Sequence, residues 1–269
     1  MRTVLLDGDM VAWRVSATAE HTIDWNDGDG PMVVSSEPIA DQVQRIKNHI
    51  AKYERLTKSD TTIICLSDPD RRYFRNDVFP AYKQHRVSKP APVQLKELKA
   101  LLASEYKGKI KPGLEADDVM GILATHPKLV PGEKVIVSVD KDMRQIPGLY
   151  FNPDKGGVRV ITEPEADLWF YTQVLTGDTC DGFPGCPGIG PVKAAQALGK
   201  ALEEWAMDAG STLYRLSESQ AMWQAIVKLY EAKGLTEADA LVQAQVARIL
   251  RSSDYDFKES KVKLWQSTH

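Results

Sequence analysis

The spacing of apolar and polar residues changes repeatedly along the first two-thirds of the chain. These spacings predict its helices and strands. Short apolar runs predict buried strands at about 3–7, 61–67 and 134–139. Apolar residues at helical spacing predict helices at about 38–54, 92–106 and 115–125. The alternation of strands and helices predicts an α/β fold with a mainly parallel central sheet flanked by helices. Turn residues at 26–30, between short apolar runs within 21–36, predict a β-hairpin.

The last third of the chain has a different pattern, which is helical with no clear strand after about residue 163. The sequence Thr162-Glu163-Pro164-Glu165 is typical of a helix start. The stretch 218–251 predicts two helices interrupted at Gly234-Leu235-Thr236. We therefore expect two domains, an α/β domain over 1–162 and a helical region over 163–269.

Acidic residues recur where the predicted strands end. Asp7 ends the first strand, Asp68 follows the second, and Asp140 and Asp142 follow the third. Further acids open a predicted helix or occupy a Gly-rich loop: Glu115, Asp117, Asp118, Asp178 and Asp181. In open α/β sheets, ligands bind beyond the carboxyl ends of the strands. Because so many carboxylates in one place would repel one another, we expect bound cations, as in a metal-dependent enzyme that acts on phosphates.

The oxygen-only character of this set favours magnesium or manganese. No His or Cys cluster with zinc-site spacing accompanies the acids, whereas all-oxygen sites suit Mg²⁺ or Mn²⁺. Two such ions about 4 Å apart can activate water and stabilise the leaving oxygen of a phosphodiester. One or two acids at a helix start would need no explanation beyond the helix dipole, but three acids within 115–118 exceed that need.

Composition indicates an ordinary soluble globular protein, with 269 residues, 43% hydrophobic and 26% charged. The three cysteines form no Cys-x-x-Cys pair, which favours a reducing setting, the cytoplasm, or the host cytoplasm for a phage-encoded protein. No apolar stretch approaches the ~20 residues of a membrane span, so no membrane partner is expected.

The net charge of −3 argues at first against a nucleic-acid partner, but the local charge distribution favours one. Basic residues outnumber acids between positions 71 and 89, where the only acid is Asp77. The basic residues of this segment are Arg71, Arg72, Arg75, Lys83, Arg86 and Lys89. Aromatic residues lie among them, so bases could stack on Phe79 or Tyr82 while the cations meet phosphates.

A glycine-rich turn, Pro187-Gly188-Ile189-Gly190, opens a predicted helix and has the pattern of a helix-hairpin-helix element. Glycines allow backbone N–H groups to approach a phosphate, the helix N-terminus attracts it, and Lys193 adds charge. An ordinary interhelical turn would look similar. The nearby Asp178 and Asp181 favour binding of a DNA backbone.

With these residues in view, the chain resembles the flap endonuclease and 5′→3′ exonuclease family, in particular the 5′→3′ exonucleases of short-tailed bacteriophages. The matching pieces are Asp7-Gly8-Asp9, Asp68 with Arg75 and Tyr82-Lys83, Glu115-Ala116-Asp117-Asp118-Val119-Met120-Gly121, Asp140-Lys141-Asp142 and Gly177-Asp178-Thr179-Cys180-Asp181-Gly182. The segment from Ala247 to Trp265 is also similar, so that the likeness covers nearly the whole chain.

The resemblance implies a two-metal nuclease that hydrolyses DNA, as duplex with a 5′ end, flap or gap, and RNA in RNA–DNA hybrids. It implies one ion at Asp7, Asp68, Glu115 and Asp117, and a second at or near Asp118, Asp140, Asp142, Asp178 and Asp181. Catalytic roles fall to these carboxylates, notably Asp7, Asp68, Asp117 and Asp140. Lys83 and Arg86 would lie near the scissile phosphate on an arch segment over about 71–92. The turn from Gly188 to Gly190, with Lys193, would hold duplex DNA and could take a K⁺ ion.

Two alternatives use fewer of these residues. The sequence Asp7-Gly8-Asp9-Met10-Val11 also fits the start of haloacid-dehalogenase-type phosphatases, in which the first Asp is a nucleophile. That interpretation leaves the acids of 115–118 and the 188–190 turn without a role. A non-catalytic DNA-binding module would use the turn and the basic segment but would leave the acids unexplained.

Overall fold

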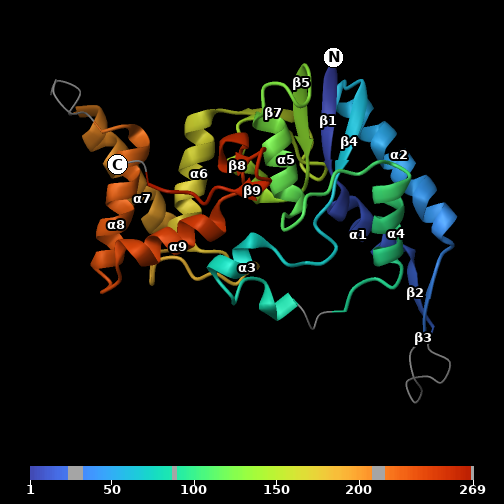
Figure 1. The fold of residues 1–269 in the computed structure, drawn as a ribbon, viewed down its shortest axis with the longest axis horizontal. Coiled ribbons are helices and arrows are strands. Elements are labelled where there is room, and N and C mark those ends of the chain that lie inside the picture. Colours follow the sequence, from blue (N-terminus) through green and yellow to red (C-terminus); the bar gives the residue numbers. More distant parts are fainter. Residues whose placement is uncertain (24–32, 87–89, 208–215, 268–269) are drawn as a thin grey trace. The chain divides into compact units, whose positions relative to one another are not determined.

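A five-stranded sheet forms the centre of the α/β part of this computed structural model, which describes residues 1–23, 33–86, 90–207 and 216–267 (Figure 1). The strand order is β4-β1-β5-β6-β7. The strands are β1 (Arg2–Asp7), β4 (Thr61–Cys65), β5 (Glu133–Val137), β6 (Gly148–Phe151) and β7 (Val158–Ile161). β1 pairs in parallel with both β4 and β5, and β5 pairs in parallel with β6. The predicted α/β class with a mainly parallel sheet is confirmed.

Helices cover both faces of the sheet. Val4 and Leu6 alternate along β1 and share a buried cluster with residues of α1 (Gly8–Ala19), α2 (Ile39–Thr57) and α4 (Leu95–Ser104). Leu5, between them, is also fully buried, and α5 (Ala116–Thr125) packs against β1, β4 and β5. Because β1 is buried on both sides, its apolar run is continuous rather than alternating.

The second part of the chain is mainly helical, with α6 (Glu163–Thr176), α7 (Pro191–Met207), α8 (Glu218–Glu231) and α9 (Glu237–Ala247) around one core. Phe170, Leu198, Ile226 and Tyr230 are fully buried there. Side-chain caps begin α6, α8 and α9, each with a Ser or Thr that accepts a backbone N–H bond. The predicted interruption between α8 and α9 is confirmed.

Several elements differ from the sequence expectations. The chain after residue 163 does contain strand, because β8 (Tyr255–Asp256) and β9 (Lys261–Val262) form a short antiparallel pair. Helix α1 and strands β6 and β7 were not predicted. In the hairpin expected within 21–36, β2 (Glu20–Ile23) and β3 (Val33–Ser36) do pair in an antiparallel manner, whereas its turn lies outside the described residues.

Two compact units divide the chain, with two short earlier segments grouped with the residues after position 160. The first contains Met1–Arg72, Lys89–Met143 and Gly148–Val160; the second contains Tyr73–Ser88, Arg144–Pro147 and Ile161–His269. Long-range hydrogen bonds explain why two short segments join the second unit. Arg75 belongs to α3 (Phe74–Val78). Its guanidinium donates to the carbonyl oxygens of Val246 at 2.9 Å and Arg248 at 2.6 Å. The buried Gln145 amide donates to the carbonyl of Ala247 at 2.7 Å.

Candidate active site

The carboxyl ends of β1 and β5 bring two of the predicted acids together through a serine. Ser138 Oγ donates to Asp7 Oδ2 at 2.8 Å and accepts the backbone N–H of Asp140 at 3.1 Å. Asp140 Oδ1 in turn accepts the N–H of Asp142 at 2.8 Å. Ser138 is fully buried. Parallel pairing of β1 with β5 therefore places Asp7, Asp140 and Asp142 in one hydrogen-bonded chain.

The end of β4 is tied to the start of α5 in a similar way. Asp68 Oδ2 accepts the N–H of Gly113 at 2.6 Å, and the Asp68 N–H donates to the carbonyl of Leu114 at 2.9 Å. Ser67 Oγ accepts the N–H of Ala116 at 2.9 Å. These bonds hold the first turn of α5 beside the carboxyl end of β4, which is the edge of the sheet where Asp7 also lies.

The acids of 115–118 have two different roles at this helix start. Glu115 and Asp118 form a reciprocal capping box, in which the Glu115 N–H donates to Asp118 Oδ2 at 3.3 Å. Asp118 is fully buried and Glu115 nearly so, whereas Asp117 is half-buried. The charge of Asp117, together with that of Asp7, adds to the effect of burial in raising the pKa of the Cys65 thiol. Asp7 and Asp117 therefore both lie near Cys65.

Negative charge is crowded around Asp7. Burial, the nearby charge of Asp9 and that of Asp140 raise the pKa of the Asp7 carboxyl from 3.8 to about 6, against the opposing hydrogen bonds from Met10 and Ser138. Lys99 Nζ forms an ion pair with Asp9 Oδ1 at 2.8 Å. A buried carboxylate with a raised pKa beside further acids is a place where a cation would lower the free energy.

The donor set of the first unit fits an oxygen-bound divalent cation. It consists of carboxylates at the ends of neighbouring parallel strands and at an adjoining helix start: Asp7, Asp68, Glu115, Asp117, Asp118, Asp140 and Asp142. Among the residues that the structure describes, no three His, Cys, Asp or Glu side chains lie close enough together to hold a metal ion. The acids are thus gathered at one edge of the sheet but do not form an assembled three-ligand site. The assignment of each acid to an ion stays a prediction.

The remaining two predicted acids, Asp178 and Asp181, belong to the loop between α6 and α7 in the second unit. Asp178 Oδ1 accepts the N–H groups of Cys180 at 2.7 Å and Asp181 at 3.3 Å, so it shapes this loop. Gly177 begins the loop with φ +64°, and an added Cβ there would lie 2.4 Å from the backbone oxygen of Phe183. The close approach requires glycine at this position.

Asp181 lies against the two cations that the family resemblance would place near the scissile phosphate. Arg86 contacts Asp181 Oδ1 at 2.8 Å, and Lys83 Nζ lies 3.5 Å from Oδ2. Tyr82 Oη donates to the same Oδ2 at 3.1 Å. Lys83, Arg86 and Asp181 therefore form one charged cluster within the second unit.

Two side chains that were expected to contact DNA are buried. Arg75 is 3% exposed and donates to main-chain carbonyls, so it holds the second unit together and is not presented to a phosphate. Tyr82 is also 3% exposed and belongs to the apolar core, so its ring cannot stack on a base. Arg71 and Arg72, in contrast, are exposed, and their role in DNA binding stays a prediction.

The glycine turn before α7 is exposed, as a backbone-phosphate contact requires. Gly188 has φ +73°, and no atom lies within 4 Å of a Cβ added at Gly188 or Gly190. Lys193 Nζ donates to the carbonyl of Gly188 at 3.1 Å. The Gly188 carbonyl therefore has a cationic partner, and binding of a K⁺ ion at this turn stays a prediction.

Two site residues, Ser67 and Ser138, were not predicted. Each directly follows an apolar strand and lies one or two positions before an acid, which is the pattern that could have identified them. Of the three cysteines, Cys65 and Cys186 are buried and Cys180 is exposed in the loop that carries Asp178 and Asp181.

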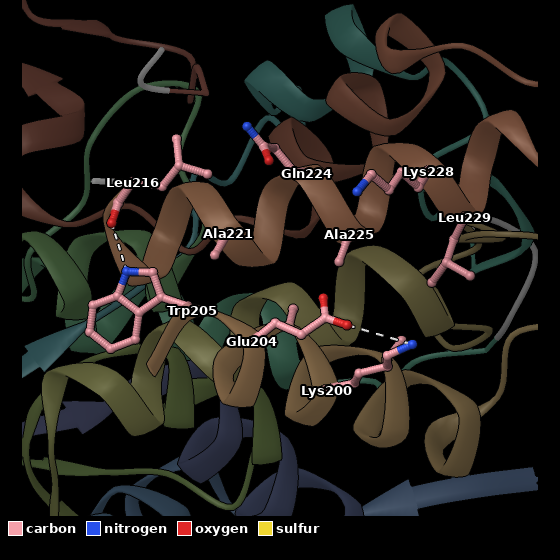
Figure 2. Close-up of a pocket in the computed structure, with 11 residues that line it drawn as sticks. Lys200, Glu204, Trp205, Leu216, Ala221, Gln224, Ala225, Lys228 and Leu229 are labelled. Atoms are coloured by element: carbon pink, nitrogen blue, oxygen red, sulfur yellow. Dashed lines mark hydrogen bonds and ion pairs between the residues drawn. The ribbon is translucent and has the colours of Figure 1, made fainter. Parts of the chain in front are cut away.

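A separate groove of about 670 Å³ lies between α7 and α8 (Figure 2). Trp205 Nε1 donates to the carbonyl of Leu216 at its end, and Lys200 pairs with Glu204 at 3.6 Å along its rim. It contains none of the predicted site residues. Within 1–23, 33–86, 90–207 and 216–267, no helix is both long and apolar enough to cross a membrane.

Comparisons with known proteins agree over most of the chain. The family described as "5'-3' exonuclease, N-terminal resolvase-like domain" matches residues 2–158. An exonuclease of Escherichia phage T7 is 30% identical over 288 residues, covering 98% of this chain and 93% of the relative. An exodeoxyribonuclease of Enterobacteria phage T3 is 29% identical, covering 97% and 92%. In fold, the chain is similar to a bacteriophage T5 flap endonuclease solved with DNA and metal ions, with a TM-score of 0.55 and 15% identity over 92% of this chain and 93% of that one.

Proposed function

Because this chain belongs to the 5′→3′ exonuclease family and is therefore a nuclease, we propose that it removes nucleotides from the 5′ ends of DNA in a reaction that depends on divalent metal ions. The substrates we propose are duplexes with a 5′ end, flap or gap, and the RNA of RNA–DNA hybrids. The family match leaves no support for the phosphatase alternative or for a non-catalytic module.

The observation that carries the proposal is the hydrogen-bonded chain Asp7–Ser138–Asp140 at the carboxyl ends of two parallel strands. With Asp68, Glu115, Asp117, Asp118 and Asp142, these carboxylates would hold Mg²⁺ or Mn²⁺. Bound divalent ions supply an activated water and stabilise the leaving oxygen of a phosphodiester. Ligation by Asp178 and Asp181 remains an expectation from the family resemblance.

Other side chains and backbone groups would orient the carboxylates and bind the DNA. Ser138 fixes the rotamer of Asp7, and the N–H of Asp142 fixes that of Asp140, so the ligand oxygens keep their directions. We expect Lys83 and Arg86 to neutralise the charge of a bound phosphate. We expect the exposed turn at Gly188–Gly190 to present backbone N–H groups to the DNA backbone.

A strand labelled differently at its two ends tests this proposal. In Mg²⁺ or Mn²⁺ we expect the 5′ label to be released first from a duplex and from a 5′-flap substrate, with no release in EDTA. A matched RNA–DNA hybrid tests the extension to RNA. Release of the 3′ label first would contradict the polarity, and digestion that is unaffected by EDTA would contradict the metal dependence.

A further inference from the structure

Asp181 contacts two cationic side chains and a hydroxyl group. Both of its carboxylate oxygens are engaged, Oδ1 by Arg86 at 2.8 Å and Oδ2 by Lys83 at 3.5 Å and Tyr82 at 3.1 Å. The side chains of Lys83 and Asp181 are each 20% exposed, so this cluster is only partly screened by solvent. An interaction of this kind constrains both cations.

The main chain strengthens the same arrangement. Lys83 N–H donates to the carbonyl of Asp181 at 2.8 Å, and Arg86 Nε donates to the carbonyl of Cys180 at 2.9 Å. Lys83 has φ +55°, a left-handed backbone conformation that costs a non-glycine residue free energy. The contacts with residues 180–181 thus hold Lys83 in a conformation that it would otherwise rarely adopt.

The chemistry of the cluster matches that of a bound phosphate. A phosphate diester, like a carboxylate, is a monoanion with two unesterified oxygens that accept charge-assisted bonds from Arg and Lys. We propose that Asp181 is a positioning residue that occupies the phosphate-binding pair Lys83 and Arg86 in the substrate-free protein, and that a DNA phosphate replaces it. This inference rests on the proposed function and concerns the same site.

A thermodynamic consequence follows from this exchange. Binding of DNA to Lys83 and Arg86 must first break their contacts with Asp181, so Asp181 lowers DNA affinity in the absence of metal. By reciprocity, occupation of the two cations by phosphate releases the Asp181 carboxylate for another partner.

A double-mutant cycle separates this role from general charge removal. Binding of a fluorescent 5′-flap DNA would be measured by anisotropy in EDTA, between 50 and 200 mM KCl, for four proteins. These are the wild type, Asp181→Asn, the double variant Lys83→Gln/Arg86→Gln, and the triple variant. We expect Asp181→Asn to bind DNA about fivefold more tightly than the wild type. The slope of log K against log salt concentration should be steeper than that of the wild type by up to roughly 0.9, the value for the one phosphate that this pair contacts.

In the Lys83→Gln/Arg86→Gln background, Asp181→Asn should change affinity by less than about 1.5-fold, because the cations that it constrains are absent. An equal gain in both backgrounds would show that only the loss of a negative charge matters, and would overturn the inference. Unchanged or weaker binding by Asp181→Asn, with or without a lower melting temperature, would also overturn it, because Asp181 would then be a structural or metal-binding group alone.

Tyr82→Phe provides a second variant that keeps every charge. It removes the hydroxyl that donates to Asp181 Oδ2, so we expect a smaller gain in affinity, about twofold; no gain would contradict the exchange. The wild type serves as the separate test of the proposed function. If it neither binds the flap in EDTA nor cleaves it in Mg²⁺, the proposed function fails and this inference falls with it, whereas normal cleavage without the Asp181 effect rejects the inference alone.

Discussion

The raised pKa of Asp7 leads to a stability prediction for Asp7→Asn in the absence of metal. The wild-type carboxyl is 7% exposed, and burial with the charges of Asp9 and Asp140 raises its pKa from 3.8 to about 6. At pH 7.5 the folded protein must therefore keep an ionised group in an unfavourable environment. The asparagine side chain has the same shape and carries no charge.

The expected magnitude comes from the size of the pKa shift. A shift of about two units corresponds to roughly 3 kcal/mol of destabilisation by the ionised form. Asparagine is also a good N-cap, so the bond from the Met10 N–H to this side chain can be kept. One of the two hydrogen bonds accepted by the carboxylate loses its partner, which costs about 1 kcal/mol. We therefore expect the free energy of unfolding at pH 7.5 to be about 1–2 kcal/mol larger for Asp7→Asn than for the wild type, so that the variant is the more stable protein.

The sign of the pH dependence is part of the prediction. Between pH 4 and 6 the folded wild type binds more protons at Asp7 than the unfolded chain does, so its stability falls as pH rises through this window. The advantage of Asp7→Asn should therefore be full above about pH 6 and should disappear near pH 4. Urea unfolding in EDTA at a series of pH values, followed by circular dichroism, measures it.

Asp70→Asn is a matched control, because Asp70 is an exposed carboxylate two residues after Asp68. It should leave the unfolding free energy within about 0.5 kcal/mol of the wild type at each pH. Addition of Mg²⁺ should stabilise the wild type and Asp70→Asn more than Asp7→Asn. An Asp7→Asn protein that is less stable than the wild type at pH 7.5 in EDTA would refute the charge-crowding argument.

Three further substitutions test other parts of the site, and a fourth, at Gly199 in α7, is a control. Asp140→Asn should retain DNA binding in EDTA while nuclease turnover in Mg²⁺ falls at least about 100-fold; retained turnover would remove Asp140 from the site. Ser138→Ala removes the hydroxyl between Asp7 and Asp140 and should lower the free energy of unfolding by about 1–3 kcal/mol in urea titrations. A neutral result would mean that the hydrogen bonds of this hydroxyl are not formed in solution. Gly177→Ala should destabilise by more than about 2 kcal/mol, because its φ is positive and its Cβ would lie 2.4 Å from main-chain atoms. Gly199→Ala, within α7 where an added Cβ meets nothing, should instead be neutral or stabilising by up to about 1 kcal/mol; equal effects at the two glycines would reject this reasoning.

The strand-end acids were predictable because parallel pairing brings the carboxyl ends of strands to one edge. Asp7 and Asp140 lie at the ends of apolar runs that are readily recognised. In the sheet, Ser138 forms hydrogen bonds with both of them. The sequence could not indicate that Ser138 would connect them, since a serine after a strand is also common in turns. Strand register, which a single sequence does not specify, decided which side chains meet.

The basic segment was harder to interpret because its pattern does not show which side chains are buried. Arg75 lies among exposed cations in sequence, yet its acceptors are main-chain carbonyls about 170 positions away. Such contacts depend on how α3 packs against α9. Tyr82 is similar, because its ring completes an apolar core formed mostly by residues after position 161. Local composition identified the segment but not the roles of these two residues.

Unequal access to the three sulfur atoms has a practical consequence. The Cys65 and Cys186 thiols are enclosed, and burial raises the pKa of each, so neither should react readily with alkylating reagents in the native protein. Cys180 is exposed and lies next to Asp181 in the chain. A maleimide dye should thus attach at one position without mutagenesis, and its emission would report directly on the loop whose carboxylate is expected to exchange with phosphate.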